Sequence, residues 1–119
     1  MAQNKNISKP LSKSDKHEMF SPMLSGIYNE TKTLSQKKPN ESLNTLKVKM
    51  INKILVEIRS ILESEDSSEF LELLDNETLP SNSDAVFILS QYLTTMKAFR
   101  EKYYGWDGLN HRWFNEKIK

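Results

Sequence analysis

The sequence contains no cysteine, three glycines among 119 residues, and no apolar run near the roughly 20 residues that span a bilayer. The absence of thiols excludes a disulfide scaffold, catalysis by a thiolate and any zinc site that uses cysteine. The three glycines form neither a dinucleotide-binding motif nor a phosphate-binding loop. Because the first 15 residues also lack the apolar middle of a signal peptide, we expect a cytoplasmic protein with no membrane segment.

The side chains that are present suit one small domain. The chain has the length of a single domain, and Leu, Ile, Val and Phe together supply 30 residues, about a quarter of it. The net charge is only +1 but is unevenly distributed: residues 1–50 carry nine basic and four acidic groups, 51–96 carry two and nine, and 97–119 carry six and three. We expect the acidic middle to pair with the basic first helix or to attract a basic partner protein.

Apolar residues at helical spacing predict an all-α fold, a small helical bundle of three long helices and one short helix. Residues 1–14 are polar and aperiodic, so we expect a disordered basic tail there and a single helical domain over 15–119. The helices are predicted at about 15–36, 40–64, 68–75 and 83–104, followed by an aromatic C-terminal segment, 105–119, packed on the last helix. Pro22 indicates either a second helix start capped by Ser21 or a kink in one continuous helix.

Two predicted helices carry the clearest apolar patterns. The helix over 40–64 has a stripe that we expect to be buried against two neighbours, made of Leu43, Leu46, Met50, Ile54, Ile58 and Ile61 and widened by Ile51, Leu55 and Leu62. The last long helix has a heptad seam with spacings of 4 and 3, made of Ala85, Leu89, Tyr92, Met96, Phe99 and Tyr103. Because the seam lasts only about two and a half heptads, we expect it to form the bundle core, and a homodimer through the 85–103 seam is the alternative.

Aromatic residues gather near the end of the chain, where eight of the eleven lie between Phe87 and Phe114. Trp, Tyr and Arg are the residue types enriched at the energetic centres of protein interfaces. The expected partner-binding residues are Tyr103, Tyr104, Trp106, His111, Arg112, Trp113 and Phe114. We expect Trp106 and Trp113 to close the core; contact with a partner is the alternative, and the two roles are not exclusive. An Asp107-Gly108 pair predicts a turn between them.

These features favour a non-enzymatic protein–protein interaction or regulatory module that uses the aromatic segment, the acidic face, or both. We expect an unidentified protein as its partner and no cofactor or metal. Lysine outnumbers arginine by 14 to 3, a bias typical of AT-rich genomes, which indicates a bacterial or phage-type system.

Two other functions are open. Basic and aromatic residues alternate over 97–113, so the protein could be a nucleic-acid-binding accessory protein, although the acidic middle argues against it. A small enzyme centred on His111 is the third reading, with Asp107 four residues earlier as the partner of its imidazole. The other histidine, His17, is expected at the surface.

Overall fold

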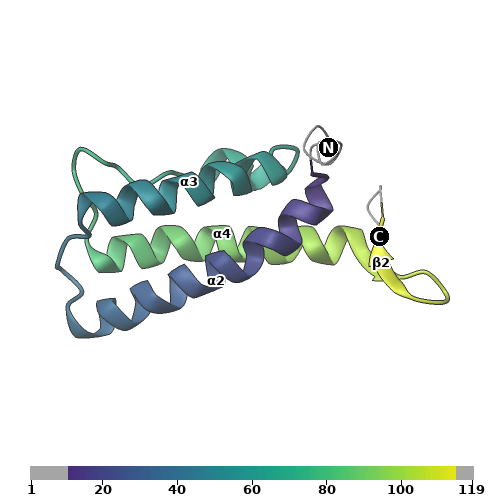
Figure 1. The fold of residues 1–119 in the computed structure, drawn as a ribbon, viewed down its shortest axis with the longest axis horizontal. Helices are drawn as coiled ribbons and strands as arrows, with labels where there is room; N and C mark the ends of the chain where they lie inside the picture. The colour runs from purple at the N-terminus through teal and green to yellow at the C-terminus, as the bar shows by residue number, and fades with distance from the viewer. Residues whose placement is uncertain (1–10, 115–119) are drawn as a thin grey trace, which may run out of the picture.

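A computed structural model of the chain describes residues 11–114, so most of the predicted tail and the last five residues of segment 105–119 lie outside the described residues. The described part is mostly helical, as predicted. Its elements are α2 (Lys13–Lys37), α3 (Thr45–Ile61), the 3₁₀ helix η1 (Asp66–Phe70), α4 (Asn82–Tyr103), β1 (Tyr104–Trp106) and β2 (His111–Trp113). Helix α2 packs against both α3 and α4, and these three helices form what we call the helical body (Figure 1).

Each α-helix begins after a residue whose side chain accepts a hydrogen bond from a backbone N–H of the first turn: Ser12, Asn44 and Ser81. Such caps satisfy amides that have no partner inside the helix. Of the two readings of Pro22, the continuous helix is correct, because Pro22 lies inside α2. The first turns of α2 lean away from the axis of the rest in Figure 1, as a proline inside a helix would cause.

The second long helix begins later than the sequence predicts. It starts at Thr45, not near residue 40, because the preceding loop bonds to the segment before α4. The amide of Asn82 donates to the carbonyl of Glu41 at 2.8 Å, and the amide of Leu43 donates to the carbonyl of Pro80 at 2.9 Å. Backbone groups paired in this way are not available to an α-helix.

The predicted short helix over 68–75 is wrong. Only η1 forms, and residues 71–75 have no helical structure. The side chain of Asn52 donates to the carbonyl of Leu74 at 2.8 Å and accepts from the amide of Leu74 at 2.9 Å. The phenol of Tyr92 donates to the carbonyl of Glu72 at 2.8 Å. Side chains of α3 and α4 therefore form hydrogen bonds with backbone groups of residues 72 and 74 that would otherwise be paired within a helix.

The mostly helical class is confirmed, but part of the predicted aromatic segment is not simply packed on the last helix: β1 and β2 form an antiparallel hairpin, residues 104–113. Tyr104 lies opposite Trp113, and Trp106 lies opposite His111. The amide of Phe114 donates to the carbonyl of Tyr103 at 2.6 Å, which extends the pairing by one bond. The hairpin projects beyond the end of α4 in Figure 1.

The heptad seam belongs to the core of a single chain, as the bundle-core interpretation predicted. Its first five residues are buried and Tyr103 packs beside them, together with apolar residues of α2 and α3. The stripe predicted for the second long helix is buried only in part. Leu46 and Met50 are 68% and 53% exposed, while Val48, which is outside the predicted stripe, is fully buried.

The predicted pairing between the basic first helix and the acidic middle is present at two sites. Lys16 Nζ lies 3.2 Å from a carboxylate oxygen of Glu57, and Lys13 Nζ lies 3.7 Å from one of Glu63. All four side chains are partly exposed, so each pair contributes at most about 1 kcal/mol to stability.

Candidate functional site

The hairpin is anchored to the helical body by Trp113. Its indole lies 5.1 Å from the imidazole of His17 and 6.1 Å from the ring of Phe99, measured between ring centroids. The indole Nε1 donates a 2.8 Å hydrogen bond to a carboxylate oxygen of Glu18. These partners come from α2 and α4. Trp113 therefore packs against the core, which is one of the two roles predicted for it.

His17, expected at the surface, is buried with 4% of its area exposed. Its Nε2 lies 2.8 Å from the carbonyl oxygen of Met96, and its Nδ1 lies 3.2 Å from the hydroxyl of Ser21. The imidazole also stacks on Phe99 at 5.6 Å. Burial lowers the pKa of His17 below its ordinary value of 6.5, and the positive charge of Arg100 acts in the same direction.

Four side chains of the two strands form an aromatic ladder along the hairpin. Successive ring centroids are 5.3 Å apart from Trp113 to Tyr104, 6.1 Å from Tyr104 to His111 and 5.1 Å from His111 to Trp106. The ladder begins at the half-buried Trp113 and ends at Trp106, which is 60% exposed. Trp106 is therefore supported by its neighbour while most of its surface remains open to solvent.

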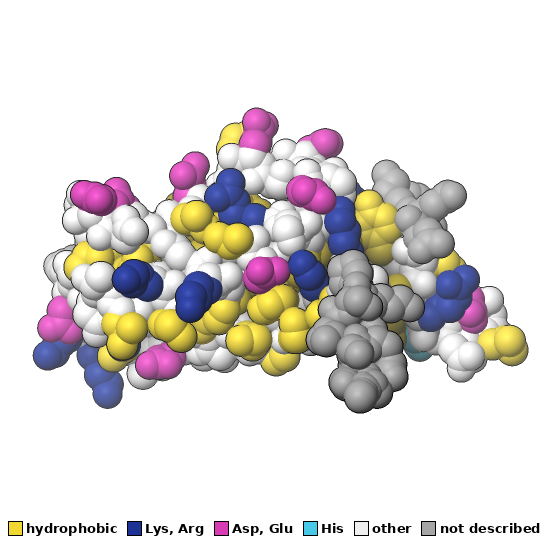
Figure 2. Space-filling model, turned by 45° about the horizontal axis from the view of Figure 1, so that its top comes forward, with side chains coloured by type: hydrophobic (Ala, Val, Ile, Leu, Met, Phe, Trp, Pro, Cys, Tyr) yellow, Lys and Arg dark blue, Asp and Glu magenta, His cyan; other side chains and the backbone are white. Residues whose placement is uncertain are grey.

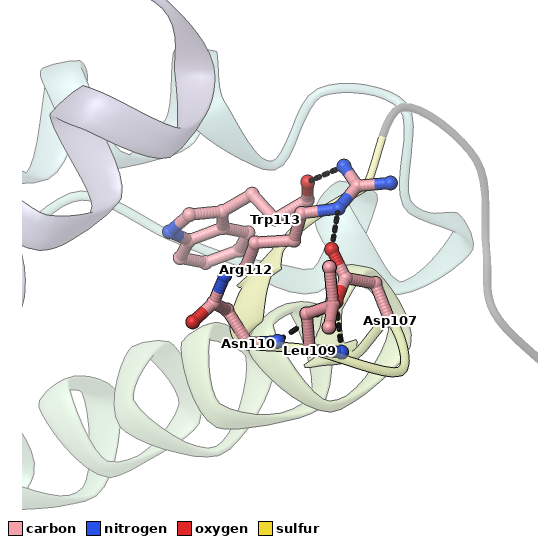
Figure 3. Close-up of polar contacts among 5 residues, drawn as sticks. All are labelled: Asp107, Leu109, Asn110, Arg112 and Trp113. Carbon is pink, nitrogen blue, oxygen red and sulfur yellow. Dashed lines mark hydrogen bonds and ion pairs between the residues drawn. The ribbon is translucent and has the colours of Figure 1, made fainter.

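The carboxylate of Asp107 organises the turn (Figure 3). Its Oδ1 accepts hydrogen bonds of 2.8 Å from the amides of Leu109 and Asn110, and its Oδ2 accepts one of 2.8 Å from Arg112 Nε. The amides of Asn110 and Leu109 together with the Arg112 guanidinium lower the pKa of Asp107. Gly108 occupies the left-handed region with φ of 104°. The predicted Asp-Gly turn is thus present and fixed by its own side chain.

The turn exposes one further apolar side chain, that of Leu109, which is 81% exposed. We use the term hairpin tip for Trp106, Leu109 and Arg112. Arg112 is held by Asp107 and also donates from Nη1 to the carbonyl of Trp113 at 3.0 Å. Leu109 therefore lies in a turn whose conformation is set internally, and Trp106 and Arg112 lie at the strand ends beside it, on opposite faces of the hairpin because Arg112 pairs with Gly105.

Two further predicted site residues, Tyr103 and Phe114, flank the hairpin and are half-buried. The phenol of Tyr103 packs on Phe99 with 4.8 Å between centroids and donates to the buried carboxylate of Glu65 at 3.4 Å. Phe114 is half-buried, and the guanidinium carbon of Arg112 lies 4.2 Å above its ring. The expected segment thus divides into anchoring residues and exposed ones.

Sequence reasoning missed Leu109 and His17 as parts of this arrangement. An apolar residue directly after an Asp-Gly turn has nothing within a two-stranded hairpin to cover it, which is the signal that marks Leu109. His17 stands at helical spacing before Phe20, Leu24 and Ile27, so the apolar face of α2 indicated its burial.

The pairing proposed for a catalytic centre does not form. The turn is not helical, and the oxygens of Asp107 bond to the turn amides and to Arg112, whereas His111 contacts Tyr104 and Trp106. Within residues 11–114, no group of three or more histidine, aspartate or glutamate side chains is arranged to hold a metal ion. No helix in that same range has both the length and the apolar character needed to cross a bilayer.

Comparisons of the chain with protein-family models, with curated protein sequences and with solved structures gave no match in any of the three. The function is therefore inferred from the geometry alone.

Proposed function

We propose that this protein is a non-enzymatic interaction module that binds a partner protein through the hairpin tip. The observation that carries the proposal is the exposure of Trp106 and Leu109 on an anchored turn, at 60% and 81%. Large apolar side chains standing free of the helical body bury much area when a partner covers them. The bacterial or phage-type cytoplasmic setting and a regulatory role remain predictions from composition.

The rigidity of the hairpin favours binding because little conformational entropy would be lost on association. Trp113 fixes the base of the hairpin to two helices, and Asp107 fixes the turn through three hydrogen bonds. Side chains that are already ordered before binding avoid the ordering cost that a mobile loop would incur. Trp106 and Leu109 would act as the apolar anchors, and Arg112 would donate a charge-assisted hydrogen bond from its remaining N–H groups.

The nucleic-acid alternative is less well supported by the same geometry. Single strands are commonly gripped by bases stacking on open aromatic rings. The Tyr104 ring is already in contact with two other groups, because Arg100 Cζ lies 3.9 Å from its centroid and His111 stacks on it. Tyr104 and Trp113 are half-buried, so Trp106 and His111 are the exposed rings of the ladder.

The experiment is affinity capture from a lysate of the source organism with the full chain as bait, followed by quantitative mass spectrometry. The bait Trp106→Ala/Leu109→Ser is compared with the wild type and with Phe87→Ser. Phe87 is the matched control, since it is an aromatic residue of α4 that is 67% exposed and lies outside the hairpin. Circular dichroism of each bait establishes that it is folded.

We expect the hairpin variant to lose a protein that the wild type and the Phe87 variant both retain. With that partner purified, loss of one central anchor should weaken binding by about 30-fold, equivalent to about 2 kcal/mol. Retention of every captured protein by the hairpin variant overturns the proposal. Nuclease-sensitive capture with a steep dependence on salt favours the nucleic-acid alternative instead.

A further inference from the structure

A second surface lies at the other end of the helical body, where α2 and α3 enclose an open apolar groove. Its volume is about 300 Å³. The groove is lined by Ile27, Glu30, Thr31, Leu34, Leu43, Leu46, Lys47, Met50, Ile51, Ile54 and Asn82. Apolar side chains form a band along one face of the molecule in Figure 2. Together with the exposure of Leu46 and Met50, at 68% and 53%, this is apolar surface that residues 11–114 leave uncovered.

The length of the groove and the spacing of the side chains along its walls suit the binding of a short α-helix. Leu46, Met50 and Ile54 repeat every four residues along α3, and Ile27 and Leu34 stand two turns apart on α2, so both walls are ridges of helical side chains. From Leu46 to Ile54 the wall rises about 12 Å at 1.5 Å per residue, which corresponds to about two turns of a docked helix. Amphipathic helices bind such grooves through apolar residues at spacings of three and four.

The charged residues near the groove indicate which kind of binding partner is complementary to it. The α3 wall, residues 45–54, carries Lys47, Lys49 and Lys53 and no acidic residue, and Glu30 is the acidic residue that lines the groove. Lys47 bridges the groove to Glu30, with 4.0 Å from Nζ to a carboxylate oxygen. Within residues 11–114, Lys37, Lys49 and Lys53 form no ion pair. The surplus of lysine on the α3 wall complements an occupant that is apolar in the centre and acidic at the edge that faces α3.

We propose that this groove binds an amphipathic α-helix of another protein, with leucine-type residues on its inner face and glutamate or aspartate on its flanks. A second copy of this chain fits less well. Two grooves facing each other across a two-fold axis would bring lysines against lysines. The acidic stretch of this chain, residues 57–77, offers as its complete helix only η1, whose five residues are too short for the groove. The proposal goes beyond the hairpin tip, because it assigns a separate partner surface to the opposite end of the molecule.

The test measures fluorescence anisotropy of three labelled synthetic peptides of about 18 residues with the full-length protein. One carries leucines at spacings of three and four with flanking glutamates, the second replaces those glutamates by lysines, and the third scrambles the first. We expect the acidic peptide to bind and the lysine peptide to bind at least about tenfold more weakly. Higher salt should reduce that difference.

Protein variants locate the binding. Met50→Glu should weaken binding of the acidic peptide by about tenfold or more, because it places a carboxylate on the apolar floor opposite the flanking glutamates. Val56→Glu is the matched control, since Val56 is an apolar residue of the same helix, 50% exposed and outside the groove, and it should bind as the wild type does. Trp106→Ala should also bind normally, which keeps this inference independent of the hairpin proposal.

Three outcomes overturn the proposal: no binding of the acidic peptide, equal binding of the acidic and lysine peptides, or equal binding by the Met50 and Val56 variants. Light scattering of the protein alone measures its molar mass in solution and so tests whether a second copy of the chain fills the groove. A dimer that Met50→Glu abolishes would show that the groove is filled by a second copy, and the helix of another protein would then be the wrong assignment.

Discussion

The imidazole of His17 and the indole of Trp113 lie 5.1 Å apart in an edge-to-face arrangement, and this contact joins the start of the first described helix to the end of the hairpin. Edge-to-face aromatic pairs contribute about 0.5–1.5 kcal/mol beyond the area they bury. Since Met96 and Phe99 contact the same imidazole, His17 connects α2, α4 and β2. The position of the hairpin tip therefore depends on a histidine far from it in the sequence.

Stability should fall as the pH is lowered from 6.5, because the pKa of His17 in the folded chain lies below that value. Well above pH 6.5 His17 is neutral in both states and its contribution is complete. Below pH 6.5 the unfolded chain takes up the proton first, so the free energy of unfolding decreases until the pH reaches the folded-state pKa. For one proton the slope is at most about 1.4 kcal/mol per pH unit. Urea denaturation between about pH 7.5 and pH 5 measures it.

The second histidine provides the control for that measurement. His111 is exposed, so His111→Gln should keep the pH dependence of the wild type, whereas His17→Gln should remove it. The pKa values of Asp75 and Asp107 lie below 3.8, outside this window. Identical pH dependence in the two histidine variants would contradict the assignment to His17.

The two tryptophans should differ in their effect on stability. Trp113→Ala removes the contacts with both helices and should lower the free energy of unfolding by about 2–3 kcal/mol, less than a fully buried tryptophan because part of its ring is exposed. Trp106→Ala removes a side chain that is 60% exposed and should change it by less than about 0.5 kcal/mol. Urea denaturation followed by circular dichroism measures both. Equal losses would mean that the hairpin is not anchored through Trp113.

The helices could be predicted because their signals are local. The 3.6-residue periodicity acts within a few positions, and the seam from Ala85 to Phe99 is buried as the pattern indicates. The helix starts were predicted less well, because the structure caps the helices with Ser12, Asn44 and Ser81 and not at the predicted starts near 15, 40 and 83. What failed depends on distant partners. Residues 68–75 have apolar residues at spacings compatible with a helix, but Asn52 and Tyr92 bind their backbone from other elements. No local pattern contains those bonds.

The sequence predicted which segment contains the site residues, but it did not predict which of their side chains are exposed. Its turn was visible in Asp107-Gly108, yet the alternation of Tyr104 with Trp106 and of His111 with Trp113 is too short to indicate strands on its own. Which ring is covered depends on Glu18 and His17, nearly the whole chain away. Composition therefore found the aromatic residues, and packing decided that Trp113 anchors while Trp106 is exposed.

Asn52 should be the polar side chain whose loss most disturbs the segment after η1. Asn52→Leu leaves the amide and the carbonyl of Leu74 without their partners, and we expect a loss of about 1–3 kcal/mol in the free energy of unfolding. Asn52→Asp keeps an acceptor for the amide but faces the carbonyl with a second oxygen, so it should also destabilise. Hydrogen exchange of the Leu74 amide provides a local readout, and unchanged protection in Asn52→Leu would contradict the bond.

Substitution by alanine should have opposite effects on the free energy of unfolding at Gly26 and at Gly108. Gly26 lies inside α2, and a Cβ added there would meet nothing within 4 Å, so Gly26→Ala should raise the free energy of unfolding by about 0.5–1 kcal/mol through helix propensity. Gly108 also has open space, but its φ of +104° is strained for any L residue, so Gly108→Ala should lower that free energy by about 1 kcal/mol or more. The two sites share no contact, so the double variant should show the sum of both effects. Thermal and urea denaturation of the wild type and the three variants measures this, and a stabilising Gly108→Ala would show that the turn has a different backbone conformation.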